Sequence, residues 1–452
     1  MCFVTTLTNQ AGTSIVCLAD TYSVSERVDF MKIFALALFL AVYVLMIILP
    51  KYRPWIALTG AVVFMIAGIV PLGKVPIAID FNVLMMLAGT MGTVALFIES
   101  RMPNRMAEVL LEHSPNVMWV VVIMSLFSGA VSAFVDNVAT VLMIAPVGLA
   151  IAKKLDISPV GMIISIAVSS NLQGAATLVG DTTSIMLGGY AGMNFLDFFF
   201  MNGKPSIFWA VELGALATVP VIILLFRKNR QHFSVEGHTE VSDYIPSWLL
   251  LGTVVLLIMA SFWRSRPAIT NGVICLSMFV VGLIYTLIRH GDLRLARDAM
   301  QEIDFETLIL LASLFVVIYG ITEAGIIDDI SRVFVNLGGS NLFLMYSIIV
   351  WGSVLFSAFV DNIPYVATML PVVAKIAGTL GCTPYLLFFG LLTGATLGGN
   401  LTPIGASANI AGIGILRKAG YEVKSKDFFK IGIPFTLCAV MVGYLFCWVF
   451  WR

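Results

Sequence analysis

The residues best suited to chemistry lie in an acidic hexapeptide that the chain contains twice. SAFVDN occupies positions 132–137 and again 357–362, an offset of 225. Each copy lies in apolar sequence and ends in an acid–amide pair, which is Asp136–Asn137 in the first and Asp361–Asn362 in the second. A carboxylate at the centre of a bilayer costs about 2.5–3.5 kcal/mol on insertion scales, so a repeated one indicates a functional site. We expect these four side chains to line an ion or substrate site and to offer oxygen ligands for Na+.

An ordinary tight loop is the alternative interpretation of each pair. Two spanning helices could meet in the headgroup zone, with Asn137 capping the second helix. That loop would be only two residues long, and the recurrence of the apolar lead-in SAFV would have no reason. In the second copy Pro364 falls in the first turn, where a helix start tolerates proline. We therefore predict that each pair forms the tip of a re-entrant hairpin whose second helix points its N-terminus into the protein.

Two further apolar stretches are interrupted by glycines, hydroxyls and amides, at 171–184 and 398–409. Irregular backbone at membrane depth is tolerated only where it is buried or lines a cavity. Its carbonyls can bind a cation, and the helix N-termini beside it can bind an anion. A glycine-packed helix contact without a ligand is the alternative. The two stretches align at the same offset of 225, with these four matches: Gly174 with Gly399, Thr177 with Thr402, Gly180 with Gly405, and Ile185 with Ile410.

Four more acids fall in or beside apolar sequence. Asp181 lies in the first interrupted stretch, and its counterpart by offset is Ala406, so the two halves differ chemically. Asp181 suits a proton or sodium coupling residue, or the N-cap of the following helix. For Glu212 we expect snorkelling or an interhelical hydrogen bond at least as much as a part in transport. Asp80 and Asp304 open helices, and we expect them to act as caps.

The composition is that of a polytopic membrane protein. Of the 452 residues 59% are hydrophobic and 12% charged, and the mean hydropathy is +0.98. A soluble protein of this length would lack a polar surface. The net charge is zero, so no nucleic-acid partner is indicated. The six cysteines are scattered without metal-ligand spacing, and we expect neither a disulfide framework nor a cofactor.

Hydropathy divides the chain into two similar halves. We predict a tail at 1–32, a first repeat at 33–226, a linker at 227–245 and a second repeat at 246–452. Uninterrupted runs of about 20 residues suggest eight spans, at 33–49, 54–70, 79–98, 206–226, 246–263, 268–288, 303–320 and 430–450. Charged amphipathic stretches follow the matching IDF tripeptides, at 99–113 and 322–336, and we expect them at the membrane interface.

The predicted fold is an all-α polytopic membrane protein with two inverted repeats. Each repeat has about five transmembrane helices, a re-entrant helical hairpin and a broken helix. An odd number of crossings gives consecutive halves opposite orientations, as is common in secondary transporters. Loops on one side hold 17 of the 26 basic residues, which predicts a cytoplasmic linker and two extracytoplasmic termini. The tail lacks the pattern of a signal peptide, and we expect a short surface segment there.

Three long motifs resemble those of one family: VDNVATVLMIAPV at 135–147, VDNIPYVATMLPVV at 360–373 and GGNLTPIGASANI at 398–410. The chain resembles the ion transporter superfamily of arsenite permeases, bacterial sodium/proton antiporters, citrate and dicarboxylate transporters and the pink-eyed-dilution protein. It is most similar to the pink-eyed-dilution and arsenite-permease-like branch. The resemblance implies an elevator-like transporter of the plasma (inner) membrane, often a homodimer, that moves a small inorganic ion or anion and is not an enzyme.

The resemblance also implies the residues of the ion and substrate sites. The first half-site would comprise Asp136, Asn137, Thr177, Gly180, Asp181 and Thr182. The second half-site would comprise Asp361, Asn362, Asn400, Thr402, Gly405, Ser407 and Asn409. In members of the superfamily these hairpin tips and unwound loops meet near the bilayer midplane.

This chain departs from the family pattern in three respects. Relatives carry a GDPPN-like loop where this chain has residues 180–184, GDTTS, and a glycine where it has Gln173. Carboxylate transporters of the superfamily typically carry a Ser-Asn-Thr tip, whereas both tips here are Asp-Asn. An extra carboxylate at each tip should repel an anion unless H+ or Na+ neutralises it. The departures favour cation exchange, or a neutral or compensated oxyanion such as arsenite, over citrate.

Three other functions remain as alternatives. The first is a citrate- or dicarboxylate-type anion permease. The second is an intramembrane aspartyl protease, which would also have two aspartates in apolar segments, although the sequence has no Gly-x-Gly-Asp motif. The third is a passive channel, whose flux would neither saturate nor be driven uphill by a second ion.

Overall fold

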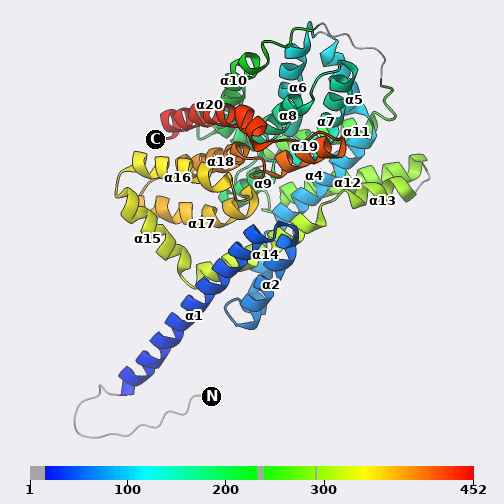
Figure 1. Ribbon diagram of the computed structural model, residues 1–452. Coiled ribbons are helices and arrows are strands. Elements are labelled where there is room, and N and C mark those ends of the chain that lie inside the picture. Colours follow the sequence, from blue (N-terminus) through cyan, green and yellow to red (C-terminus); the bar gives the residue numbers. More distant parts are fainter. Residues whose placement is uncertain (1–15, 113, 232–238, 264, 291–292) are drawn as a thin grey trace, which may run out of the picture.

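The structure is a computed structural model that describes residues 16–112, 114–231, 239–263, 265–290 and 293–452 (Figure 1). Helices make up almost all of its regular structure, beside one short hairpin of β1 (Phe200–Met201) and β2 (Lys204–Pro205). The first half contains α1 (Val16–Ile48), η1 (Pro50–Tyr52), α2 (Arg53–Ile66), η2 (Leu72–Lys74), α3 (Val75–Ala78), α4 (Phe81–Glu99), α5 (Met102–Leu111), α6 (Val117–Ser132), α7 (Asn137–Lys154), α8 (Val160–Gln173), η3 (Gly174–Ala176), α9 (Thr182–Ala191), η4 (Leu196–Phe198) and α10 (Ile207–Phe226).

The second half repeats the order of elements from α4 to α10. It contains α11 (Ile245–Ser261), α12 (Thr270–His290), α13 (Leu293–Gln301), α14 (Phe305–Glu323), α15 (Ile326–Gly338), α16 (Leu342–Ser357), α17 (Asn362–Leu380), α18 (Tyr385–Gly398), η5 (Gly399–Leu401), α19 (Ser407–Lys418) and α20 (Ser425–Trp451). The series α4 to α10 thus matches the series from α14 to α20 helix by helix. This agrees with the two repeats predicted from the sequence.

The two halves exchange helices with one another. Helix α2 of the first half packs on α14 of the second, and α12 of the second half packs on α4 of the first. In the same way α19 packs on α7 and α8, whereas α9 packs on α17 and α18. Figure 1 shows α9 and α19 near the centre of the molecule, between the elements of both halves. Neither half could therefore bury its own apolar faces alone.

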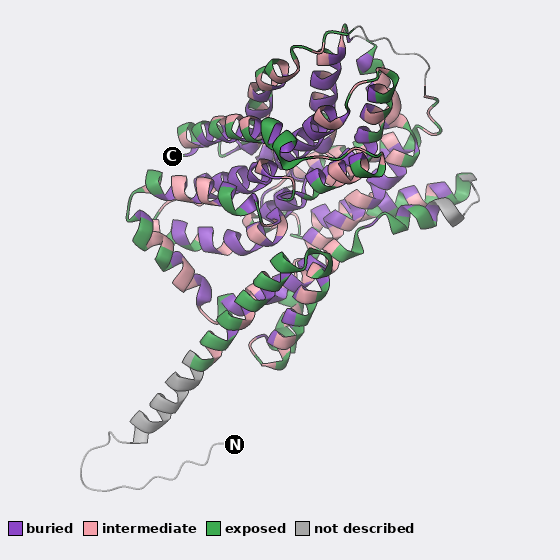
Figure 2. Ribbon diagram, in the orientation of Figure 1, coloured by how far each residue is buried: buried purple, intermediate pink, exposed green. Residues whose placement is uncertain are grey.

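Eight helices in the described part of the chain are long and apolar enough to cross a membrane. They are α1, α4, α7, α10, α12, α14 together with the end of α13, α17 and α20. Helices α15 and α16 meet at 116° and could form a ninth, bent span. The outer faces of many of these helices are exposed in Figure 2, while the centre of the molecule is buried. This distribution of apolar surface is that of a multi-span membrane protein.

Both acid–amide pairs interrupt helices as predicted. Helix α6 ends at Ser132 and α7 begins at Asn137, and α16 and α17 are separated in the same way. A headgroup loop would be exposed in the bare protein, but Asn137, Asp361 and Asn362 are only 5%, 7% and 6% exposed. The tips therefore lie inside the protein. The two glycine-rich stretches also break where predicted, at η3 and η5.

The first two spans differ from the prediction in length. The expected surface segment at 1–32 is helical from Val16 onward, and residues 1–15 lie outside the described part. Once a helix has formed over 33–48, each added residue gains a hydrogen bond at little cost, so α1 extends backward. The span predicted at 54–70 ends at Ile66, because Ala67 and the following Gly68, at a φ of 74°, close the helix.

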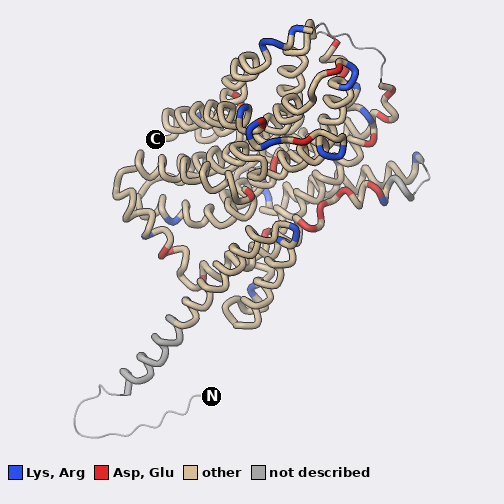
Figure 3. Tube along the Cα trace, viewed as in Figure 1, with Lys and Arg blue, Asp and Glu red and all other residues tan. Residues whose placement is uncertain are grey.

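The two amphipathic stretches form the helices α5 and α15. Helix α5 buries Pro103, Ala107 and Leu111, which recur every four residues along one face. Figure 3 shows Lys and Arg gathered towards the ends of α5, α10 and α19. These ends border three of the six loops from which the orientation was predicted. Arg53 belongs to a loop in the sequence-based count, but its side chain is largely buried against the second hairpin tip.

Candidate functional site

The first tip is held by hydrogen bonds with α6, with its own helix α7 and with α8. Asp136 caps α7, with Oδ1 accepting from the backbone N–H groups of Val138 at 2.9 Å and Ala139 at 3.2 Å. Asn137 Oδ1 accepts from the Ser132 hydroxyl at 2.8 Å, and Asn137 Nδ2 donates to Asn171 Oδ1 at 3.2 Å. The cap is therefore the acid and not Asn137. The other oxygen, Asp136 Oδ2, accepts no hydrogen bond from the described part of the chain.

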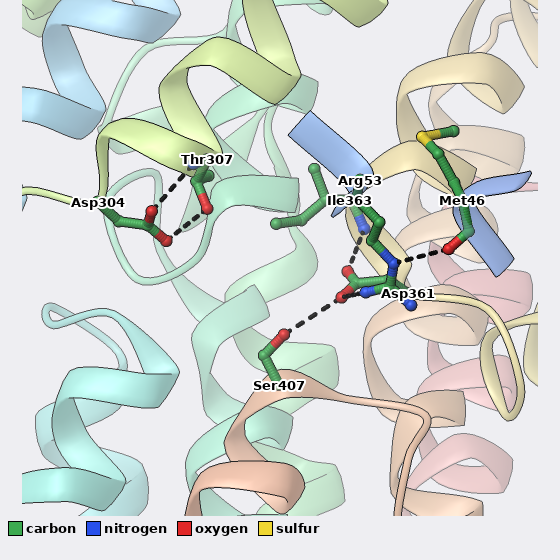
Figure 4. Close-up of polar contacts among 7 residues, drawn as sticks. All are labelled: Met46, Arg53, Asp304, Thr307, Asp361, Ile363 and Ser407. Carbon is green, nitrogen blue, oxygen red and sulfur yellow. Dashed lines mark hydrogen bonds and ion pairs between the residues drawn. The ribbon is translucent and has the colours of Figure 1, made fainter. Parts of the chain in front are cut away.

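The second tip has the same sequence and a different environment. Asp361 caps α17, with Oδ1 accepting from Ile363 N at 3.1 Å. Its other oxygen, Oδ2, accepts from Arg53 Nη1 at 2.8 Å and from the Ser407 hydroxyl at 3.2 Å. In Figure 4, Arg53 and Ser407 approach this carboxylate from different sides, and Arg53 Nε reaches the Met46 carbonyl. Both oxygens of Asp361 are thus used within the protein.

The two unwound loops repeat one hydrogen-bond pattern. The Thr177 hydroxyl donates to the Ala133 carbonyl beside the first tip, and the Thr402 hydroxyl donates to the Ala358 carbonyl beside the second. Each threonine ties a loop to its own hairpin. The pattern explains why a threonine stands at this position in both halves.

Gly180 and Gly405 each face three carbonyl oxygens. A Cβ at Gly180 would lie 2.7–2.9 Å from the carbonyl oxygens of Gly174, Ala133 and Ser132. A Cβ at Gly405 would lie 2.6–2.8 Å from those of Gly399, Ala358 and Ser357. Only glycine fits such a position, and a cradle of carbonyl oxygens is suited to a hard cation.

Ser184 performs the function that Asn409 performs in the other half. Ser184 Oγ donates to the Gly174 carbonyl at 3.2 Å, and Asn409 Nδ2 donates to the Gly399 carbonyl at 3.1 Å. The serine found in place of the asparagine of relatives therefore conserves the bond. Asn409 Oδ1 is buried and has no hydrogen-bond partner in the described structure. It is a free oxygen at the second loop.

Amide side chains join the two halves at the centre. Asn171 Nδ2 donates to the carbonyl of Thr396, its counterpart at the offset of 225, at 2.7 Å and to Asn400 Oδ1 at 3.1 Å. Asn400 Nδ2 in turn donates to the Val168 carbonyl at 2.9 Å. A residue in contact with its own counterpart lies next to the axis that relates the repeats. The predicted site residue Asn400 thus lies at this junction.

Asp181 stands at the first residue before α9, but its side chain makes no capping hydrogen bond. Instead Oδ2 accepts from the Thr183 hydroxyl at 2.8 Å, and Thr183 lies 3.0 Å from the Thr396 hydroxyl of the other half. Glu212 lies in α10 within 3.5 Å of the Gln173 amide nitrogen. This is the interhelical contact named as the alternative to a transport role.

A cavity of about 520 Å³ opens between the first tip, α4 and the start of α14. Five acids line it: Asp136, Asp181, Glu99, Glu302 and Asp304. Lys and Arg are absent among the described residues of its wall. Asp181 is 5% exposed, whereas Glu99, Glu302 and Asp304 are exposed. Acids therefore extend from the surface to the interior, and such a wall attracts cations and repels anions.

The cavity collects six of the thirteen predicted site residues, which are Asp136, Asn137, Asp181, Thr182, Asn362 and Ser407. The other seven (Thr177, Gly180, Asp361, Asn400, Thr402, Gly405 and Asn409) are not on its wall and hold the loops, tips and halves together. Sequence reasoning missed Glu99 and Glu302. Their signal was an acid at the end of one span and another just before the start of the matching one. Asp304 does cap α14, through Thr307 N at 3.0 Å, and also lines the cavity (Figure 4).

Comparison with solved structures supports the fold. The crystal structure of the Alcanivorax borkumensis YdaH transporter matches with a TM-score of 0.58 and 13% sequence identity, covering 85% of each chain. At this identity the match shows a shared fold alone. The all-helical transporter fold predicted from the sequence is thereby confirmed.

Curated relatives include transporters and membrane proteins. An uncharacterized transporter of Mycobacterium bovis is 28% identical, with 93% of this chain and 98% of that protein aligned. The 46 kDa membrane protein of Mycobacterium leprae is also 28% identical, with 93% and 99% aligned. The human P protein is 26% identical over 90% of this chain, which spans 59% of that longer protein. These matches confirm the predicted resemblance to the pink-eyed-dilution branch.

The family itself is shown by a match that covers most of the chain. Residues 43–394 match the model described as CitMHS, citrate transporter. This range contains both tips, the first unwound loop and the five acids of the cavity. Together with the fold, the match shows that the chain is a multi-span membrane transporter of the citrate transporter family.

Proposed function

We propose that the protein is a secondary active transporter coupled to a cation, H+ or Na+. Its acidic cavity would admit the cation, and the free oxygen of Asp136 with Asp181 would bind it. The acidic wall described above is the observation that carries this proposal. Because this wall repels anions, exchange of Na+ for H+ is the reaction that we favour.

A second candidate is an anion permease of the citrate or arsenite type. Two observations favour it: the family match, and the N-terminal ends of α7, α9 and α19, whose first residues line the cavity. Helix N-termini bind anions. An anion in this cavity would have to enter neutral, as arsenite does, or together with a compensating cation.

Transport of either substrate would occur by an elevator-like movement, in a homodimer located in the plasma membrane. The hairpins and broken helices would move as one body against α1, α2, α11 and α12. Interior sites formed from tips and unwound loops support a rigid-body movement of one bundle against another, which is common to secondary transporters built from repeats.

Proteoliposomes that contain a pH-sensitive dye test the choice between substrates. A pH gradient is imposed, and Na+, Li+, arsenite, phosphate and citrate are added in turn. Dissipation of the gradient by Na+ or Li+ supports cation exchange. A response to an oxyanion alone supports the permease. The absence of any response would contradict the exchange of Na+ for H+ and an anion permease coupled to H+.

A further inference from the structure

The two hairpin tips are identical in sequence, yet the structure surrounds them with different charges. Asp136 lines the acidic cavity and keeps one carboxylate oxygen free. Asp361 is not on the cavity wall, and its carboxylate already has a cationic partner in Arg53. The difference cannot arise from the tips themselves. It arises from α2, which carries Arg53 to one tip only.

The contact between Arg53 and Asp361 is a largely buried ion pair. The side chains are 18% and 10% exposed, whereas the pairs Lys32–Asp329, Arg105–Glu108, Arg105–Glu112, Arg332–Asp329 and Lys375–Asp328 each have a partner that is at least 32% exposed. An ion pair in such surroundings is costly to desolvate, and removal of one partner is far more damaging than replacement of both. The pair therefore has a role other than the stability of a surface contact.

Further bonds show what the pair holds in place. Asp361 Oδ2 joins Arg53 of α2 to Ser407, the first residue of α19, while Asp361 Oδ1 caps α17. On the other side Arg53 Nε donates to the Met46 carbonyl, at the end of α1, at 3.2 Å. The Tyr43 hydroxyl donates to the Pro364 carbonyl, in the first turn of α17, at 2.7 Å. The end of α1 and the start of α2 thus bind the start of α17, and through Asp361 they are linked to the start of α19.

We propose that Asp361 is a positioning residue and not an ion ligand, and that Arg53 is its built-in counter-ion. The coupling cation would then be bound by the carboxylates of the first tip and of Asp181. In the conformation of this structure, the pair fixes the second tip against the end of α1 and the start of α2. This assignment rests on the proposed cation-coupled transport, and it makes the two identical hexapeptides unequal in function.

The assignment is tested with charge-neutral pairs of substitutions in proteoliposomes of the full-length protein. Arg53→Gln or Asp361→Asn alone leaves one buried charge without its partner, and we expect flux to fall at least tenfold. The double variant R53Q/D361N removes both charges. We expect its flux to recover to within about threefold of the wild type, with a half-saturating cation concentration changed by less than about twofold.

Asp136→Asn provides the matched control, because it alters the same residue of the same hexapeptide. We expect R53Q not to restore its flux. Recovery of D136N by R53Q, or a folded R53Q/D361N variant as inactive as the single variants, would overturn the assignment. If the neutral double variant does not fold, R53K/D361E replaces it. That variant keeps both charges and should transport with an unchanged half-saturating cation concentration. A half-saturating concentration ten times higher would contradict the proposal.

A failure of the proposed function can be distinguished from a failure of this assignment. Wild-type protein without any cation-dependent flux would contradict the proposed transport. The interaction between Arg53 and Asp361 would then be measured by a double-mutant cycle, with the temperature of thermal unfolding as the readout. A double variant that unfolds above both single variants supports the counter-ion. Additive losses in the two single variants would refute it.

Discussion

At the scale of single residues, environment and not identity decides what each aspartate can do. Asp136, Asp361 and Asp304 all cap helices through one carboxylate oxygen. They differ in what the second oxygen meets, which is the cavity at Asp136, Arg53 with Ser407 at Asp361, and the Thr307 hydroxyl at Asp304. Capping is thus common to all three, and the free oxygen singles out Asp136.

Asp136→Asn should abolish transport without unfolding the protein. Asparagine caps helices about as well as aspartate, so α7 keeps its first turn while the cavity loses its free carboxylate. We expect flux to fall at least a hundredfold and the melting temperature to change by less than about 3 °C. The matched control is Asp80→Asn, which alters a capping acid that is not on the cavity wall. Equal losses of flux in both variants would contradict a special role for Asp136.

Gly180→Ala and Gly405→Ala should each destabilise the protein. A methyl group at either position would lie within 3 Å of three carbonyl oxygens, and overpacking of this kind costs about 1–3 kcal/mol. Thermal unfolding in detergent measures the loss. Gly352→Ala is the control, since nothing lies within 4 Å of its added Cβ in α16 and alanine favours a helix. A loss at Gly352 as large as at Gly180 would contradict the steric explanation.

At the scale of elements, the protein uses each broken helix to brace a hairpin. In each unwound loop a threonine hydroxyl donates a hydrogen bond to the hairpin of its own half. The helix that follows the loop packs against the other half. The loops are therefore joints between the halves as well as walls of the site. Their backbone can stay irregular because it is buried, and the hydroxyls satisfy part of its hydrogen bonding.

Thr177→Val and Thr402→Val should have similar effects, because the two hydroxyls make the same bond. Each substitution keeps the shape and leaves a buried carbonyl without its donor, at a cost of about 1–3 kcal/mol. We expect lower thermal stability and reduced flux in both variants, measured on the same preparations. Thr→Ser at either position retains the hydroxyl and should therefore retain most of the thermal stability and most of the flux. A large effect at one position only would contradict the equivalence of the two joints.

At the scale of the whole molecule, the two halves are interleaved, and the candidate site lies between them. Helices α2 and α12 are exchanged, α9 and α19 are exchanged, and Asn171 and Asn400 join the halves at the centre. Two separate domains would need no such exchange. The arrangement agrees with repeats of opposite orientation, which predicts where the linker and the C-terminus lie.

The linker and the C-terminus should lie on opposite sides of the membrane. With the six native cysteines replaced, Glu240→Cys should react with a membrane-impermeant maleimide only after the cells are opened, and Arg452→Cys should react in intact cells. An odd number of crossings in the second half requires this difference. Labelling of both positions from the same side would contradict the inverted repeats.

The sequence by itself determined the class, the repeat and most of the breaks. Hydropathy indicated the spans, because a lipid-facing segment must be apolar. The repeated SAFVDN and the glycine-rich stretches marked where helices stop, because capping acids and glycines act on the few residues beside them. The threonines and glycines that recur at the offset of 225 were found in the same way. Such signals are local, so a single chain can reveal them.

The tertiary structure alone decided which residues line the cavity. Arg53 lies 308 residues from Asp361, and only the packing of α2 against α14 brings the charge to one tip and not to the other. Glu99, Glu302 and Asp304 join Asp136 in the same way, through the contact of α14 with α4. Repetition in the sequence predicts two equal half-sites. The charges around them differ, because a long-range ion pair depends on where whole helices pack and not on the residues beside it.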